Sequence, residues 1–366
     1  MTVGILGAGQ LGRMLALAGY PLGLDFLFLD ASALTPGGQV APILCGSFQD
    51  RGLLGQLAAK SEVVTFDWEN VPVDALRALH PKVRIAPSVA ALAVAQDRVQ
   101  EKQLFGRLKI PTTKWSAVES LAQLQESVRT IGLPVVVKTR RMGYDGKGQC
   151  VVRSLEDLER AWEMLGTQPL ICENLLAFDA EVSAIGARNA RGEIALYPLS
   201  GNLHSQGMLR LTRAPYGGAA LHALAAKYLR RILREFQYVG VLAVEFFVCR
   251  GRLIANEMAP RVHNSGHWTI EGAVTSQFEN HLRAILDLPL GRTDPLGHSA
   301  MINLIGEMPE RGRLLRAPGV HLHDYGKTAR PGRKLGHCTV VATTARRRDA
   351  AARKLLKELA LPIRIP

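Results

Sequence analysis

Short apolar runs and helical patterns alternate along the first part of the chain. Runs apolar enough for buried strands lie at residues 3–6, 24–29, 62–66 and 83–86. Apolar positions at helical spacing separate them at 53–59 and 73–79. Strands that alternate with helices are typical of a parallel α/β sheet. The pattern therefore predicts an N-terminal Rossmann-like domain with a parallel sheet over residues 1–95.

The pattern changes beyond this domain. A long helical pattern over 88–106 indicates a connecting helix. Short strands at 135–138, 170–173 and 241–245 then stand among turn signals and helices, which indicates an α+β domain over 96–290. A smaller tail follows, with an apolar run at 301–305, the segment 321–323 and an amphipathic helix at 350–359. It predicts a small C-terminal domain over 291–366, so the fold class is α/β and α+β in three domains.

Length and composition agree with a multidomain enzyme. A chain of 366 residues suits two or three domains, and 47 % hydrophobic with 21 % charged residues is ordinary for a globular protein. No uncharged apolar run approaches the roughly 18 residues of a membrane span. The N-terminus lacks the basic region of an export signal, and the five cysteines are dispersed without a C-x-x-C pair. We therefore expect a cytoplasmic protein with no membrane partner.

The net charge of +13 allows three interpretations. Arg346, Arg347 and Arg348 could belong to a nucleic-acid surface, the cations could collect anionic substrates, or the surface could simply be rich in arginine. No aromatic residues alternate with the arginine run. We therefore expect no nucleic acid partner.

The first glycine motif follows the first predicted strand. Gly7, Gly9 and Gly12 form G-x-G-x-x-G, and Asp30 closes the second strand at the spacing of a ribose-binding carboxylate. A dinucleotide site is the first interpretation. A phosphate cradle for another anion, or merely a tight turn, are the alternatives.

A second glycine loop follows the strand that carries Lys138. Gly143, Gly146 and Gly148 surround Lys147 before the next strand begins. Such a loop between two strands can fold over phosphates and exclude water, with Lys138 neutralising charge. The spacing is not that of a Walker A loop, so ATP binding by another architecture is preferred over an ordinary hairpin.

Two glutamates flank a predicted hairpin turn. If the turn centres on Gly251, Glu245 and Glu257 are cross-strand neighbours on one face, and with Asn256 they offer oxygen ligands for Mg²⁺. A register shift of one residue would place them on opposite faces. A solvated pair of glutamates is the alternative.

Histidines and cations concentrate in two later segments. His263 and His267 are four residues apart, which on a helix could bind zinc, but the Pro, Asn, Ser and Gly around them favour a polar loop lining a cleft with Arg261. Lys327, Arg330, Arg333 and Lys334 form a glycine-containing basic segment suited to a phosphate group, with a solvated loop as the alternative.

Taken together, these segments resemble the N5-carboxyaminoimidazole ribonucleotide synthetases, a family of ATP-grasp ligases. The matching stretches are residues 7–14, 65–72, 96–111, 143–149, 256–271 and 330–337. Residues 259–269, APRVHNSGHWT, are the most specific of them, whereas the glycine motifs alone are weak. The stretches span nearly the whole chain.

The resemblance implies a reaction and its partners. ATP and bicarbonate would form carboxyphosphate, and its carboxyl group would pass to the exocyclic amine of 5-aminoimidazole ribonucleotide. The products would be N5-carboxyaminoimidazole ribonucleotide, ADP and phosphate, in purine biosynthesis. ATP and Mg²⁺ are the expected cofactors, and a homodimer is the expected assembly.

The resemblance also implies roles for individual residues. ATP-binding positions match Arg98, Lys138, Gly143, Tyr144, Asp145, Gly146, Lys147, Gly148, Gln149, Glu173, Glu181, His204, Asn256 and Glu257. Mg²⁺ ligands match Glu245 and Glu257, and the carboxyphosphate and ribonucleotide side matches Tyr144, Asp145, Arg261, His263 and Asn264. Lys327, Arg333 and Lys334 match the substrate-phosphate side. Asp145 is expected to orient the aminoimidazole or to act on its amine proton.

One departure and several alternatives remain. Asp67 stands where the family more often has glutamate, which leaves open how far this carboxylate reaches, while Glu69 is retained. A formate-dependent glycinamide ribonucleotide transformylase or a biotin carboxylase would be related alternatives, but the 263–268 loop argues against both. An NAD-dependent dehydrogenase rests on Gly7, Gly9, Gly12 and Asp30 only. A non-catalytic nucleotide-binding regulator would not require the two glutamates beside a basic cleft.

Overall fold

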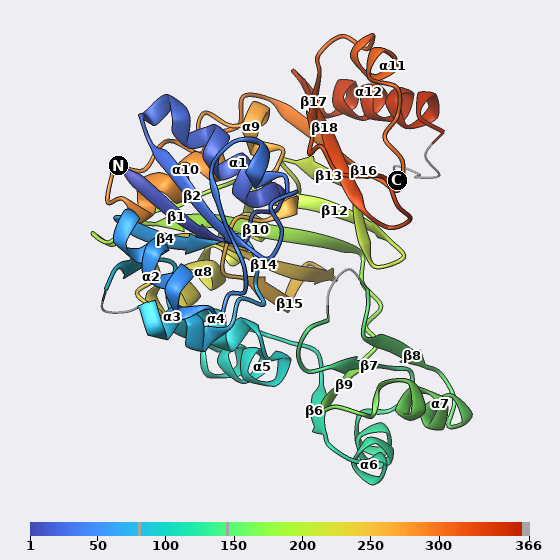
Figure 1. The fold of residues 1–366 in the computed structure, drawn as a ribbon. Coiled ribbons are helices and arrows are strands. Elements are labelled where there is room, and N and C mark those ends of the chain that lie inside the picture. The colour runs from blue at the N-terminus through green and yellow to red at the C-terminus, as the bar shows by residue number, and fades with distance from the viewer. Residues whose placement is uncertain (80–81, 144–145, 361–366) are drawn as a thin grey trace.

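The N-terminal domain is a parallel sheet between helices, as predicted. The computed structural model of the chain describes residues 1–79, 82–143 and 146–360. The strands are β1 (Thr2–Leu6), β2 (Asp25–Asp30), β3 (Ile43–Cys45), β4 (Val63–Phe66) and β5 (Arg84–Ile85), in the order β3-β2-β1-β4-β5. Each pairs in parallel with its neighbours, and the helices are α1 (Gln10–Gly19), α2 (Arg51–Lys60) and α3 (Val73–Leu79). Figure 1 shows this domain in blue.

The prediction of one continuous connecting helix over 88–106 is wrong. The segment forms α4 (Val89–Ala95) and α5 (Arg98–Arg107), with a break at Gln96 and Asp97. The break arises because Asp97 caps α5, with its Oδ1 accepting the Val99 N–H at 3.0 Å. Such an N-cap satisfies a backbone donor that a helix start would otherwise leave unpaired.

A small lobe follows the connector. It consists of β6 (Trp115–Val118), β7 (Val135–Thr139), β8 (Gln149–Val152) and β9 (Leu170–Asn174), with α6 (Leu121–Ile131) and α7 (Glu156–Leu165). The strands pair antiparallel in the order β6-β9-β7-β8. In Figure 1 this lobe projects away from the rest of the molecule. The glycine loop therefore belongs to a separate, protruding sheet.

A nine-stranded sheet forms the body of the protein. Its strands are β10 (Ala180–Arg188), β11 (Ile194–Leu196), β12 (Ser200–Ser205), β13 (Met208–Ala214), β14 (Gly240–Cys249), β15 (Arg252–Ala259), β16 (His298–Ile305), β17 (Val320–Asp324) and β18 (Lys334–Ala342). The order is β15-β14-β10-β12-β13-β16-β18-β17, with β11 beside β10. Because β13 pairs with β16, the sheet continues across the boundary proposed at residue 290.

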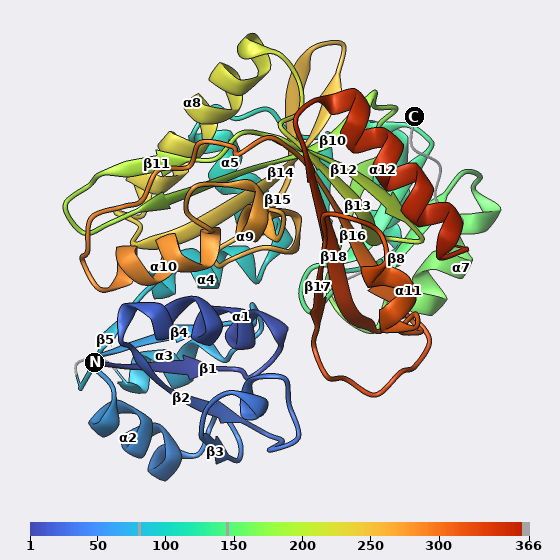
Figure 2. The ribbon, with the colours of Figure 1, turned by 90° about the horizontal axis from the view of Figure 1, so that it is seen from above.

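Helices cover the faces of this sheet. Figure 2 shows α10 (Gln277–Ile285) between the N-terminal sheet and the body, and α8 (Ala219–Glu235) on the other face. The C-terminal strands carry α11 (Arg311–Leu315) and α12 (Ala345–Glu358). Helix α12 starts earlier than the predicted residue 350, because Thr344 Oγ1 caps it by accepting the Arg347 N–H at 3.2 Å. Across the described residues, no helix has both the length and the apolar character that a membrane crossing requires.

His281 of α10 joins the N-terminal domain to the body. Its fully buried imidazole lies 2.9 Å from Thr65 Oγ1 in β4 and accepts the Val241 N–H of β14 at 3.2 Å through Nδ1. Burial lowers the pKa of His281 to about 3. The ring is therefore neutral in the folded protein at every pH where the protein is ordinarily handled.

Acidification should consequently destabilise this junction. An unfolded histidine takes up a proton below about pH 6.5, whereas the folded ring does so only near 3, so stability is lost as pH falls through this window. Between pH 7 and 5 the loss from His281 should be about 2 kcal/mol. The free energy of unfolding, measured with urea at pH 7 and at pH 5, should decrease by about 2 kcal/mol less in His281→Gln than in the wild type. An unchanged pH dependence in the variant would contradict the assignment.

Candidate active site

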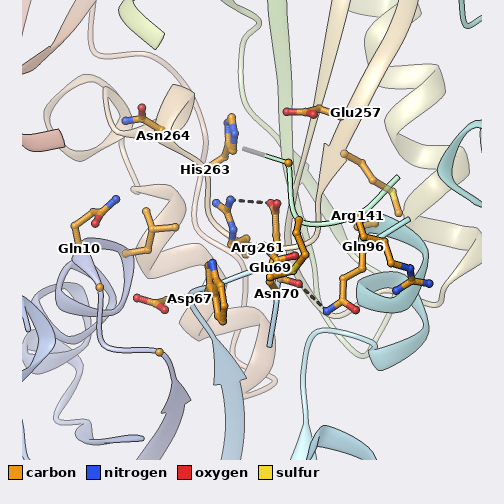
Figure 3. A pocket seen from close by; sticks show the side chains of 18 of the residues that line it. Gln10, Asp67, Glu69, Asn70, Gln96, Arg141, Glu257, Arg261, His263 and Asn264 are labelled. Atoms are coloured by element: carbon orange, nitrogen blue, oxygen red, sulfur yellow. Dashed lines mark hydrogen bonds and ion pairs between the residues drawn. The ribbon is translucent and has the colours of Figure 1, made fainter. Parts of the chain in front are cut away.

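A cavity of about 750 Å³ opens where the three parts of the chain meet. The N-terminal glycine motif lines one side, and Arg98 with the residues before the glycine loop lines another. Glu257 and the loop after β15 close the third side (Figure 3). The cavity therefore collects residues from nearly all the motifs that the sequence singled out.

The first glycine motif is filled by the protein's own carboxylates. Asp67 Oδ2 accepts the Gly12 N–H at 3.0 Å, and Asp30 Oδ2 accepts the Ala8 N–H at 2.8 Å. A methyl group on Gly7 would lie 1.9 Å from Asp67 Oδ1. Burial raises the pKa of Asp67 to about 6. Because Asp67 occupies the place at the α1 N-terminus where a dinucleotide would set its pyrophosphate, this motif does not serve as a dinucleotide site here.

Two arginine–glutamate pairs cross the cavity. Arg261 Nη2 lies 2.7 Å from Glu69 Oε1, and Arg98 Nη1 lies 3.1 Å from Glu257 Oε2. Figure 3 shows the first pair as a dashed contact in the middle of the site. Burial raises the pKa of Glu69, although the Arg261 charge opposes it. Glu69 thus pairs with Arg261 in the cavity, while the shorter Asp67, which also lines the cavity, accepts the Gly12 N–H of the glycine motif.

Glu173 is held by two lysines, of which Lys102 is buried and Lys138 is nearly buried. Lys138 Nζ lies 2.8 Å from its Oε1 and Lys102 Nζ lies 2.9 Å from its Oε2, while Thr113 donates to Oε2 at 2.6 Å. Burial alone would raise the pKa of Glu173, but the two ammonium groups lower it far below the ordinary value. Burial also lowers the pKa of Lys138. The sequence reasoning missed Lys102, a lysine whose partner lies far away in the chain.

The two predicted metal ligands are cross-strand partners because of a bulge. The turn residues Arg250 and Gly251 both have positive φ, of 50° and 75°, so the turn is centred between them. In a regular hairpin, a turn centred there would put Glu245 and Glu257 on opposite faces of the sheet. The pairing shifts after Glu245, which leaves Asn256 as the extra residue and brings Glu257 opposite Glu245.

The donor set fits a magnesium ion. Burial raises the pKa of Glu245 to about 7, and the Glu257 charge adds to this rise. The Arg98 charge lowers the pKa of Glu257 against the effect of burial. Asn256 Oδ1 is buried, and no described residue hydrogen-bonds to it. In proteins Mg²⁺ commonly takes one or two carboxylates and completes its coordination with water and substrate phosphates, which agrees with a pair of glutamates here.

Glu181 and His204 form a third polar pair near these glutamates. His204 Nδ1 lies 2.9 Å from Glu181 Oε2, across strands β12 and β10. Burial alone would lower the pKa of His204, but Glu181 and the neighbouring Glu245 raise it to about 9. The pair therefore places a cation beside the two glutamates.

The histidine-rich loop lines the cavity with one histidine only. His263 and Asn264 face the cavity, where Asn264 exchanges two hydrogen bonds with Asn303 at 2.8 and 3.1 Å. The His267 ring is buried away from it, 4.9 Å from the His337 ring and 5.5 Å from the Phe278 ring. A zinc pair of His263 and His267 is thereby excluded, and the polar-loop interpretation is confirmed.

Gln277 holds this loop in place. Its Oε1 accepts the His263 N–H at 3.0 Å, and its Nε2 donates to the His263 carbonyl at 2.6 Å, as a paired strand would. The side chain is fully buried in α10. The sequence pattern contained no signal for this contact, because a glutamine at the start of a helix is common.

Replacing Gln277 with methionine should therefore misplace His263. The change leaves a buried N–H and C=O unpaired, at a cost of about 2–4 kcal/mol in unfolding free energy. We expect kcat of the purified variant to fall about tenfold, measured beside urea unfolding. Gln56→Met, at an exposed position of α2, is the matched control and should change neither quantity. A wild-type kcat in Gln277→Met would show that the two hydrogen bonds from Gln277 are not needed to position His263.

The basic segment contributes unevenly to the site. Lys334 lines the cavity, and the Lys327 ammonium donates to the Gln10 side chain beside the glycine motif. Arg333 is instead hydrogen-bonded to its own loop, through the Thr328 carbonyl at 3.1 Å. Burial lowers the pKa of Lys327 to about 8. Two of the three predicted phosphate cations thus lie at the cavity or the neighbouring motif.

The second glycine loop lies at the edge of the same cavity. Gly143 lines it, and Gly146 and Gly148 have φ of 77° and 71°, a conformation that favours glycine. Lys147 and Gln149 lead into β8, where Gln149 is the first residue of the strand. Tyr144 and Asp145 fall outside the described residues. The start of the loop that the sequence assigned to ATP therefore lines the same cavity as Glu257.

Family models and known proteins match this architecture. The ribonucleotide synthetase preATP-grasp domain matches residues 1–96, the ATP-grasp domain 103–278 and the phosphoribosylaminoimidazole carboxylase C-terminal domain 299–351. The boundaries proposed after residues 95 and 290 stay predictions. N5-carboxyaminoimidazole ribonucleotide synthase of Pseudomonas aeruginosa is 47 % identical over 93 % of this chain and 94 % of that protein.

Solved structures agree in fold. The crystal structure of N5-carboxyaminoimidazole ribonucleotide synthetase from Thermus thermophilus has a TM-score of 0.95 and 49 % identity, over 99 % of this chain and 100 % of that one. The Aspergillus clavatus enzyme, in complex with ADP and 5-aminoimidazole ribonucleotide, has a TM-score of 0.92 and 32 % identity, over 98 % of each chain.

Fold and site together define an ATP-grasp ligase, an enzyme that uses ATP. Within that class the chain belongs to the N5-carboxyaminoimidazole ribonucleotide synthase family, which its whole-length relatives share.

Proposed function

We propose that the protein carboxylates 5-aminoimidazole ribonucleotide with bicarbonate at the expense of ATP, giving N5-carboxyaminoimidazole ribonucleotide in purine biosynthesis. One observation carries the proposal most directly. A single cavity joins Glu257 and Arg98, which suit a nucleotide, to Arg261, His263 and Lys334, which suit a second set of anions. Glu245 is the cross-strand partner of Glu257. A dehydrogenase would need the first glycine motif, which Asp67 fills.

The nucleotide side consists of cations and polar residues around Glu173. Lys138 and Arg98 would neutralise ATP phosphates, and the loop from Gly143 to Gln149, including Lys147, would cover them. The remaining proposed ATP contacts are Glu173, Glu181, His204 and Asn256. Phosphoryl transfer to bicarbonate brings two anions together, so these positive groups offset their repulsion and the developing charge.

Glu245 and Glu257 would hold Mg²⁺, with Asn256 Oδ1 close by as a further oxygen. When bound, the ion would neutralise phosphate charge and orient the γ-phosphate. The protein's own contribution is to hold the two carboxylates opposite each other on neighbouring strands.

The carboxyl transfer would occur beside Arg261. A bicarbonate oxygen attacks the γ-phosphorus, the bond to the β-phosphate oxygen breaks, and ADP leaves. The amine nitrogen of the ribonucleotide then bonds to the carboxyl carbon of carboxyphosphate and gives up a proton to Asp145 or to the leaving phosphate. The bond between that carbon and the oxygen it shares with phosphorus breaks, and phosphate leaves with that oxygen. Arg261, His263 and Asn264 would position these anions, and the closed loop would keep water from hydrolysing carboxyphosphate.

The far end of the ribonucleotide would bind the basic segment. Lys327 and Lys334 suit its phosphate, with Arg333 as a further cation on the same loop. Tyr144 and Asp145 are proposed to act at the amine, with Asp145 orienting the ring or accepting its proton. We also propose a cytoplasmic homodimer.

Substrate-dependent ADP release tests the proposal. The protein is mixed with ATP, Mg²⁺ and bicarbonate, and ADP is followed with and without 5-aminoimidazole ribonucleotide. We expect ADP release to depend on the ribonucleotide. Absence of that dependence would reject the proposed reaction, and turnover of NADH in its place would restore the dehydrogenase interpretation.

A further inference from the structure

A chain of side-chain contacts that the reaction steps above do not use runs from the histidine-rich loop to the basic segment. Glu271 lies in α9 (Thr269–Gly272), directly after that loop, and its Oε1 is 2.5 Å from Nε2 of His323 in β17. The His323 ring stacks on the ring of its cross-strand partner His337 in β18, with centroids 4.4 Å apart. His337 Nδ1 in turn lies 2.7 Å from the Tyr325 hydroxyl. We call these four residues the Tyr325 network.

The network is fixed along its length. His337 is fully buried, and burial lowers its pKa well below the ordinary value, so its neutral ring stacks on His323 without charge repulsion. Strand β17 lies at the edge of the body sheet beside β18, and an edge strand has backbone partners on one side only. The contact between Glu271 and His323 adds a side-chain tie from α9 to this edge strand. The basic segment, which follows β17, therefore starts from a fixed position.

The network ends at the ammonium group of Lys327. The Lys327 Nζ lies 5.7 Å from the centroid of the Tyr325 ring, within the range of a cation–π contact. The same ammonium donates to the side chain of Gln10, which lines the cavity. The Tyr325 ring is 2 % exposed, so its neighbours leave it little room to move. Lys327 is thus held between a buried ring and a residue of the cavity wall.

An aromatic ring suits this position because Lys327 has cationic neighbours. Burial lowers the pKa of Lys327 to about 8, and the charges of Arg333, Lys334 and Arg330 lower it further. The face of the Tyr325 ring is negatively polarised and attracts the ammonium. A carboxylate would attract it more strongly, but its full negative charge would repel a phosphate. The ring therefore fixes the cation and leaves its charge available to an anion.

We propose that Tyr325 is a positioning residue, which holds the Lys327 ammonium at the cavity wall for the phosphate of the ribonucleotide. His337 and the contact between Glu271 and His323 fix the position of the ring. The inference rests on the proposed function, because it takes Lys327 as a ligand of that phosphate. Tyr325 does not itself line the cavity in the described part of the chain and acts through Lys327.

Two substitutions of Tyr325 test the proposal by steady-state kinetics. Tyr325→Leu removes the ring, whereas Tyr325→Phe keeps the ring and removes its bond to His337. We expect KM for the ribonucleotide to rise about tenfold in Tyr325→Leu and about threefold in Tyr325→Phe, with kcat and KM for ATP within about twofold of the wild type. An unchanged ribonucleotide KM in both variants would overturn the proposal. So would losses spread equally over kcat and both KM values, which would indicate a general structural role.

Tyr228→Leu is the matched control for the loss of a buried ring. Tyr228 lies in α8 with 8 % exposure, and the Arg231 guanidinium carbon is 5.9 Å from its ring centroid. The substitution therefore removes similar packing and a similar cation–π contact, but no residue of α8 lines the described cavity. We expect the ribonucleotide KM of Tyr228→Leu to equal that of the wild type.

Substitutions of Glu271 test the far end of the network. Glu271→Ala removes the contact with His323, whereas Glu271→Gln keeps an oxygen that can accept the Nε2–H. The ribonucleotide KM should rise about fivefold in Glu271→Ala and clearly less in Glu271→Gln. Glu271→Ala combined with Tyr325→Leu should be no worse than Tyr325→Leu alone, because both act on Lys327 through the same contacts. Additive losses in the double variant would contradict the network.

The reactivity of the Lys327 amine tests its positioning without any turnover. Reductive methylation with formaldehyde, followed at Lys327 by peptide mass spectrometry, should be faster in Tyr325→Leu than in the wild type and unchanged in Tyr228→Leu. Equal rates in Tyr325→Leu and the wild type would overturn the positioning role. If the wild type releases no ADP in response to the ribonucleotide, the proposed function fails, but the methylation rates still decide whether Tyr325 holds Lys327.

Discussion

Replacing Lys138 with methionine is expected to lower kcat for ribonucleotide-dependent ADP release by about 10²–10³-fold. The Lys138 ammonium is nearly buried, 2.8 Å from Glu173, and stands where a nucleotide phosphate would approach the small lobe. Methionine keeps the length of the side chain but removes its charge. Negative charge that develops during phosphoryl transfer would then lack one fixed counter-charge in a site shielded from water.

The fold should survive this change. Lys102 remains 2.9 Å from the other Glu173 oxygen, so the carboxylate keeps a partner, and circular dichroism should show an intact protein. Lys114→Met removes an exposed lysine close to the same sheet and is the matched control, with unchanged kcat expected. A Lys138→Met variant within about threefold of the wild type would remove Lys138 from the catalytic account.

Gly7→Ala is the substitution with the largest expected effect on stability. Gly7 has φ of 92°, and an added methyl group would meet Asp67 Oδ1 at 1.9 Å. Left-handed strain and overpacking together should cost roughly 3–5 kcal/mol of unfolding free energy. Urea unfolding followed by fluorescence measures the change.

Two further variants separate the causes of that loss. Gly7→Ala with Asp67→Ala removes the clash but keeps the strained φ, so it should recover part of the stability. Gly55→Ala is the control, because an added methyl group there meets open space within α2 and should stabilise by about 0.5–1 kcal/mol. If Gly7→Ala were as stable as the wild type, Asp67 would not fill the glycine motif.

The N-terminal domain could be predicted because its signals are local. Alternating apolar runs and helices identify a parallel sheet without knowledge of any distant contact. The break between α4 and α5 was missed for a different reason. The signal, an aspartate at position 97 that can cap a helix, was present, but the apolar spacing continued across it.

The candidate site depended more on long-range structure. The spacing of Glu245 and Glu257 suggested a pair, yet only the bulge at Asn256 brings them opposite each other. No periodicity rule reveals a bulge of this kind before the partner strand is known.

Two other features could not be obtained from sequence patterns at all. Asp67, directly after β4, fills the first glycine motif, so a carboxylate of the protein occupies the apparent dinucleotide site. Lys102 meets Glu173 only after the small lobe has folded against α5. Both contacts join residues far apart in the chain, so local composition carries no trace of them.

Transfer of oxygen from bicarbonate to phosphate tests the central claim most directly. In one turnover with ¹⁸O-labelled bicarbonate, ATP, Mg²⁺ and 5-aminoimidazole ribonucleotide, the phosphate released should carry one ¹⁸O atom, because a bicarbonate oxygen attacks the γ-phosphorus and leaves with it. Phosphate without label, with ADP formed at the same rate, would mean that water or another nucleophile attacks ATP, and would contradict a carboxyphosphate route.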